Sequence, residues 1–166
     1  MPESVDPRHL LLIGAGPGVG ASVVRRFGRE GFRSTLISRG GTLEQLAAQL
    51  RSDGLEIEAV AADIEDLGGY RATLERIFRA PGAPGVAVYN AALPDPGEIL
   101  ETTVGRLRTA YDVDVVGAVV AAQVAAPVLR TASGTLLSPA AASPTIRCPH
   151  WRACPWGRPP CARRRP

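Results

Sequence analysis

The sequence predicts an α/β fold: a doubly wound parallel sheet of about five strands with flanking helices, with the C-terminal part of the fold missing. Three observations predict it. Short apolar runs alternate with segments of helical period between residues 9 and 138, which favours parallel strands joined by right-handed crossovers. The first apolar run ends in a glycine-rich turn. After Ser138 all periodicity stops.

The expected elements follow one another through short turns. Short apolar runs bounded by turn residues indicate buried strands, here at residues 9–14, 34–38, 56–62, 86–89 and 134–138. Apolar residues at helical spacing predict helices, here from about residue 19 to Gly31, from Thr42 to Gly54, from about Asp66 onward, and over 99–130. Thr42–Gln45 matches a capping box, and residues 81–85 are expected to form a loop.

Charge and composition divide the chain into two parts. Residues 1–114 contain all sixteen acidic residues and twelve of the nineteen arginines, whereas residues 115–166 contain seven arginines and no acid. Residues 139–166 alone hold seven prolines, six arginines and three cysteines. We therefore expect one domain over 1–138, followed by a Pro/Arg-rich tail over 139–166 that is disordered or non-native. A truncation or a change of reading frame near residue 139 would produce such a tail, and the encoding DNA tests this.

Several classes of protein are disfavoured by the same counts. Residues 1–147 contain no cysteine, and no signal peptide is visible, which favours a cytoplasmic location. The longest apolar run, 115–129, is shorter than the ~20 residues of a membrane-spanning helix, so we expect no membrane association. No zinc-binding pattern matches the spacing of Cys148, His150, Cys154 and Cys161. The run Arg163–Arg165 is too short to indicate nucleic-acid binding. We expect no metal and no nucleic acid.

The most informative motif is the glycine-rich turn Gly14-Ala-Gly-Pro-Gly-Val-Gly20. Glycines at the end of a strand let a pyrophosphate approach main-chain amides at the start of a helix. The spacing fits two glycine patterns of dinucleotide-binding folds, one through Gly16 and Gly18 and one through Gly14, Gly18 and Gly20. We expect the backbone of Gly14, Gly16, Gly18, Val19 and Gly20 to hold a dinucleotide. The alternative is a tight turn without a ligand.

The end of the second strand indicates which dinucleotide. NAD sites usually carry an acidic residue about 20 residues after the glycines, but this chain has Ser38 and Arg39 there. A guanidinium matches a phosphate group, so the sequence favours NADP, with NAD as the less favoured cofactor. The alternative is that Arg39 is a solvated loop residue.

Further stretches complete a family resemblance. Asp63-Ile64 ends the third strand, Asn90-Ala91-Ala92 follows the fourth, and Tyr111–Gly117 lies in the long helix. In order and spacing, these stretches and the glycine turn resemble the short-chain dehydrogenase/reductase family, from residue 9 to 138. The resemblance implies a Rossmann-like fold and hydride transfer with a small-molecule carbonyl or alcohol. It also implies a possible homo-oligomer, since family members commonly associate through the long helix and the next one, and the next one is expected to be missing here.

The resemblance also assigns roles to particular residues. Asp63 corresponds to the residue that meets the adenine, and Asn90 to one beside the cofactor, with Ala92 in place of the usual glycine. Asp114 stands where the family carries a catalytic Asn, and an ionised carboxylate cannot donate a hydrogen bond as an amide does. Ser138 lies near the position of the catalytic Ser, although a chance Ser at a strand end is the favoured interpretation.

The family's Tyr-x-x-x-Lys signature cannot be formed. The chain contains no lysine, and its three tyrosines all precede the fifth strand. We therefore expect an oxidoreductase by family that is inactive in this chain. The alternative is a non-catalytic nucleotide-binding or interaction module. The exposed face of Val115–Val128 would then be an apolar surface that binds a partner or causes aggregation. The sequence does not predict the substrate, the oligomeric state or the stability of the chain.

Overall fold

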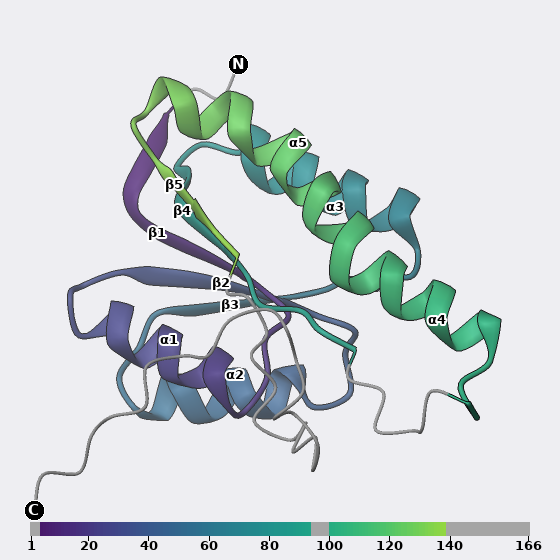
Figure 1. Ribbon diagram of the computed structural model, residues 1–166. Coiled ribbons are helices and arrows are strands. Elements are labelled where there is room, and N and C mark those ends of the chain that lie inside the picture. Colours follow the sequence, from purple (N-terminus) through teal and green to yellow (C-terminus); the bar gives the residue numbers. More distant parts are fainter. Residues whose placement is uncertain (1–3, 94–99, 139–166) are drawn as a thin grey trace, which may run out of the picture.

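A computed structural model describes residues 4–93 and 100–138 (Figure 1). In these residues five parallel strands form one sheet in the order β3-β2-β1-β4-β5. The elements are β1 (Val5–Ile13), α1 (Val19–Gly28), β2 (Arg33–Ser38), α2 (Leu43–Ser52), β3 (Ile57–Ala61), α3 (Leu67–Arg79), β4 (Ala83–Tyr89), α4 (Val104–Tyr111), the π-helical turn η1 (Asp112–Val116), α5 (Gly117–Thr131) and β5 (Thr135–Leu137). The predicted doubly wound fold is confirmed. The predicted tail, 139–166, lies outside the described residues.

Helices cover both faces of the sheet (Figure 1). Successive side chains of a strand point to opposite faces, so β1 contributes to two separate clusters of buried residues. Leu10 and Leu12 pack in the cluster formed with α1 and α2, while Leu11 and Ile13 pack in the cluster formed with α3 and α5. All four of these side chains are at most 1% exposed. This burial on both faces explains why the strand appears in the sequence as a continuous apolar run.

The first and fourth strands begin earlier than their apolar runs predict. Val5 pairs with Ala83 and Asp6 with Pro84, and the register shifts between Asp6 and Leu10. The shift surrounds Pro7, which has no N–H to donate to a sheet. The prediction of a loop over 81–85 is therefore wrong for residues 83–85, because strand pairing overrides the turn preference of the Pro and Gly residues there.

The long predicted helix is an uninterrupted helical run, α4–η1–α5, that begins at Val104 instead of residue 99. Thr103 caps it, since its hydroxyl accepts a hydrogen bond from the Arg106 amide. By length and composition alone this run would suffice to cross a membrane, a test that core helices of soluble proteins also pass. Here α5 packs against α3 and β4 (Figure 1).

The π-turn η1 is held by two buried tyrosines. Tyr89 donates a hydrogen bond to the carbonyl of Val113, and Tyr70 donates one to the carbonyl of Gly117 at 3.4 Å. A Cβ on Gly117 would lie 2.5 Å from Cγ2 of Ile64. Single π-turns leave the regular helical hydrogen-bond pattern. Tyr89 bonds a carbonyl inside this turn, and Tyr70 bonds the carbonyl of the first residue of α5.

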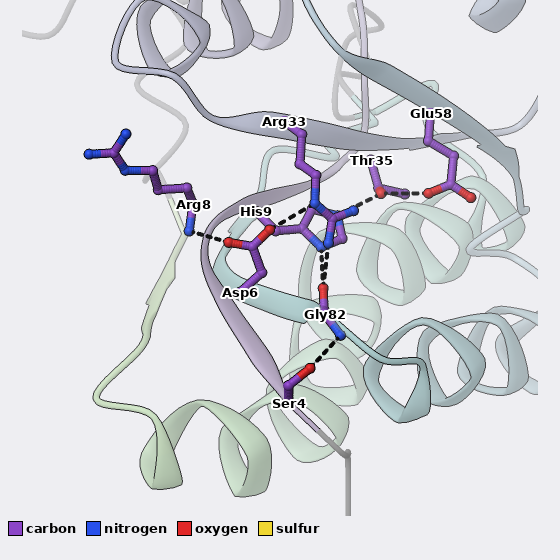
Figure 2. A network of polar contacts seen from close by, with 8 residues as sticks. All are labelled: Ser4, Asp6, Arg8, His9, Arg33, Thr35, Glu58 and Gly82. Carbon is purple, nitrogen blue, oxygen red and sulfur yellow. Dashed lines mark hydrogen bonds and ion pairs between the residues drawn. The ribbon is translucent and has the colours of Figure 1, made fainter.

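At the amino ends of the strands, a polar network that the sequence did not predict surrounds His9 (Figure 2). The His9 ring is 4% exposed; its Nδ1 lies 2.9 Å from the Gly82 carbonyl and its Nε2 lies 2.8 Å from Oγ1 of Thr35. Burial lowers the pKa of His9. Beside it, a hydrogen bond from Arg33 lowers the pKa of Asp6. This network joins β1, β2 and the start of β4 toward the amino ends of the strands, whereas the glycine turn lies at their carboxyl ends.

Candidate functional site

A cleft of about 200 Å³ opens at the carboxyl ends of the strands. Clefts at this edge of doubly wound sheets are where ligands bind. It brings together many of the predicted site residues, namely Gly14, Ser38, Arg39, Asp63, Ile64, Asn90, Ala91 and Ala92. It is also lined by residues that were not predicted: Ala15, Ile37, Ala62, Leu93 and Val113. The cleft is therefore lined by residues at the ends of four strands and by η1.

The glycine turn is held in place by its neighbouring strands. The amides of Gly14 and Ala15 both donate to the carbonyl of Ile37 at 2.9 Å. From the other side, Asn90 Nδ2 donates to the Gly14 carbonyl at 3.0 Å, and the Asn90 amide donates to the Ile13 carbonyl at 2.7 Å. Gly14 has a φ of +84°, which side-chain-bearing residues rarely adopt. The turn is therefore shaped by contacts with both adjacent strands.

Gly16 and Gly18 have no protein atoms close to the position that a side chain would occupy. A Cβ added to Gly16 or Gly18 would meet nothing within 4 Å, whereas one on Gly20 would lie 3.3 Å from Cδ2 of Leu12. No side chain caps α1 at Gly18. The amides of Ala21 and Ser22 donate to the carbonyls of Gly16 and Gly18, so the amides of Val19 and Gly20 are the ones at the helix start that suit an anion. Gly16 and Gly18 thus border open space, and Gly20 lets α1 pack closely on β1.

The opposite end of the cleft is polar and charged. Arg39 directly follows β2, and its Nη1 donates to Oε1 of Glu65 at 2.9 Å. Asp63, which follows β3, accepts a hydrogen bond from the Glu65 amide at 3.0 Å. Sequence reasoning missed Glu65, because its pairing with a residue 26 positions earlier depends on β2 and β3 being neighbours.

Asp114 and Ser138 lie in different surroundings. Oδ1 of Asp114 accepts a hydrogen bond from the amide of Leu93 at 2.8 Å and so connects η1 to the segment after β4. Burial, with a smaller contribution from the Asp114 charge, raises the pKa of Tyr89 to about 12. Ser138 is exposed, follows β5 and is not among the cleft-lining residues.

Comparison with known proteins identifies the family. The family described as short chain dehydrogenase matches residues 8–147. The chain belongs to the short-chain dehydrogenase family. The resemblance inferred from the glycine turn and the Asn90 motif is thereby confirmed.

Individual members of the family show the same relationship. The chain is 31% identical over 110 residues to 1-deoxy-11-beta-hydroxypentalenate dehydrogenase of Streptomyces arenae, covering 64% of this chain and 39% of that protein. A short-chain dehydrogenase from Sphingobium yanoikuyae in complex with NADPH superposes with a TM-score of 0.70 at 26% identity, over 78% of this chain and 52% of that one.

L-Sorbose reductase from Gluconobacter frateurii, complexed with NADPH and L-sorbose, shares the fold. Its TM-score is 0.71 at 23% identity, over 83% of this chain and 54% of that one. The chain thus spans about half the length of these solved structures and less of the Streptomyces relative.

Proposed function

We propose that this chain is the cofactor-binding part of an NADP-dependent oxidoreductase that acts on a small-molecule carbonyl or alcohol. The observation that carries the proposal is the cleft, which is lined by Gly14 and Ala15 of the glycine turn and by Arg39. Gly16 and Gly18, which follow in the same turn, do not line the cleft but border open space. A guanidinium at the end of β2, at the position where NAD sites usually carry an acidic residue, suits the 2′-phosphate of NADP better than the free hydroxyls of NAD. Family membership supports the dinucleotide itself.

Each part of the cleft has a place in this proposal. The amides around Gly16 and Gly18 would bind the diphosphate, and Ser38 and Arg39 would bind the 2′-phosphate. Asp63 and Ile64 would border the adenine. On the far side, residues 90–92 would border the inner ribose, with the Asn90 side chain holding the glycine turn in shape. When bound, the cofactor supplies or accepts the hydride.

We further propose that this chain alone transfers no hydride. The chain contains no lysine, and the Tyr-x-x-x-Lys pair that the family uses for proton transfer therefore cannot form. Asp114 occupies the helix position of the family's Asn, and its carboxylate already accepts a hydrogen bond from Leu93. The chain should show no NADPH oxidation with a panel of aldehydes and ketones, and a measurable rate with any of them would refute this part.

Titration of the full chain with NADPH and NADH, followed by nucleotide fluorescence, tests the binding proposal. Hydrogen bonds to charged groups contribute roughly 1.5–3 kcal/mol, so Arg39→Ala should weaken NADPH binding by about ten-fold or more. NADH binding should change less than about two-fold. Arg26→Ala is a matched control, since Arg26 also pairs with a glutamate but lies on α1. Absence of binding by the unmodified chain would refute the proposal.

A second function, a non-catalytic interaction module, is favoured by an exposed apolar stripe on the helical run. Its members are Val104, Leu107, Tyr111, Val115 and Val119, which are 42–64% exposed. The predicted surface over 115–128 is only partly right, because Val128 packs against the core and the stripe starts earlier. Light scattering separates the alternatives. A monodisperse oligomer that binds NADPH favours a module, and aggregation favours an incomplete enzyme.

A further inference from the structure

The residue proposed to recognise the 2′-phosphate is already engaged by a carboxylate. Arg39 and Glu65 form an ion pair of 2.9 Å in which the side chains are 59% and 42% exposed. Among the described residues that line the cleft, Arg39 is the only basic one, and Asp63 adds a second carboxylate at the same end. The proposed phosphate site therefore contains one positive charge and two negative charges.

The position of Glu65 is set by the fold. β2 and β3 pair in parallel, with Ser38 opposite Ala61, so the residues that follow the two strands emerge side by side. The Asp63 carboxylate then accepts a hydrogen bond from the Glu65 amide and shapes the turn that carries Glu65. As a result, the Glu65 side chain reaches the guanidinium of Arg39 from the turn that follows the neighbouring strand, β3.

We propose that Glu65 is a specificity-determining residue whose carboxylate competes with the 2′-phosphate of NADP for Arg39. This inference rests on the proposed function. A phosphate that binds Arg39 displaces Glu65 or shares the guanidinium with it, and in either case two groups of like charge approach one another. NAD carries a hydroxyl at this position, so it neither displaces Glu65 from Arg39 nor brings a second negative charge close to it. Glu65 therefore lowers the preference of the cleft for NADP over NAD.

Glu65→Gln tests the inference, because glutamine keeps the shape of the side chain and removes its charge. Exposed ion pairs contribute at most about 1 kcal/mol, so we expect NADPH to bind about five-fold more tightly at low salt. NADH binding should change by less than about two-fold. Glu30→Gln is the matched control, since Glu30 pairs with Arg26 on the surface of α1 and the substitution changes the net charge equally. Circular dichroism confirms that each variant is folded.

A double-mutant cycle then separates competition for Arg39 from general repulsion. In the Arg39→Ala background, Glu65→Gln should improve NADPH binding by less than about two-fold. Equal gains in both backgrounds would overturn the inference, as would unchanged or weaker NADPH binding by the single Glu65→Gln variant. These failures are distinct from failure of the proposed function, which would appear as an unmodified chain that binds neither NADPH nor NADH.

Discussion

The contrast between Gly14 and Gly16 provides the sharpest test of the glycine turn. In the Gly14→Ala variant, the new methyl group would overlap the main-chain N and Cα of Ala91 and lie 2.8 Å from its Cβ. The backbone there has a φ of +84°. Neither strain can be relieved by a side-chain rotation, because the obstructing atoms are mostly backbone. We therefore expect Gly14→Ala to destabilise the folded chain severely.

The expected magnitude follows from two contributions. A left-handed backbone costs a non-glycine residue about 1–2 kcal/mol, and overpacking costs about 1–3 kcal/mol. Gly14→Ala should thus lower the free energy of unfolding by about 2–5 kcal/mol, out of the roughly 5–15 kcal/mol typical of a native protein. With a urea dependence near 2 kcal/mol per M, the unfolding midpoint should fall by more than about 1 M.

Urea denaturation followed by far-UV circular dichroism measures this effect, and Gly16→Ala is the matched control. A Cβ on Gly16 meets no protein atom within 4 Å, so its free energy of unfolding should change by less than about 0.5 kcal/mol. Its NADPH affinity should nevertheless fall about ten-fold, because the methyl group enters the proposed phosphate space. If Gly14→Ala unfolded within about 0.5 kcal/mol of the unmodified chain, the described packing of the turn on Ala91 would be wrong.

Two further predictions concern stability. Because burial lowers the pKa of folded His9 below its ordinary value, the unfolded chain binds more protons below about pH 6.5, and the free energy of unfolding should decrease on acidification. Denaturation at pH 7.5 and 5.5 should show this decrease, and a His9→Asn variant that keeps it in full would contradict the assignment. Separately, Asp66→Ala should cost about 1 kcal/mol, because its carboxylate caps α3 by accepting from the Gly69 amide at 3.1 Å. Thr42→Ala should cost only a few tenths in the same assay, since Thr42 forms no side-chain cap; equal losses would contradict the cap assignment.

Part of the candidate site could be predicted from the sequence, and part of it depends on contacts between residues that lie far apart in the chain. The sequence predicted Ser38 and Arg39 from their distance to the glycine turn, and Asp63 and Asn90 from the family resemblance. All four lie at or directly after the end of an apolar run, and strand ends meet at one end of a parallel sheet. It could not predict Glu65 or Leu93, whose contacts depend on which strands are neighbours and on the course of the chain across η1.

The fold class, the order of the elements and the glycine turn were determined by the sequence alone, because apolar periodicity and glycine chemistry act over a few residues. Other features were decided only by tertiary structure. The Thr42 capping box does not form a side-chain bond, His9 is buried in a network with Thr35, and the long helix contains a π-turn. Thr42 and Gln45 are only three residues apart, and no described contact explains why their capping box does not form. The His9 network and the π-turn depend on hydrogen-bond partners that lie far away in the sequence, and local preferences contain no information about such partners.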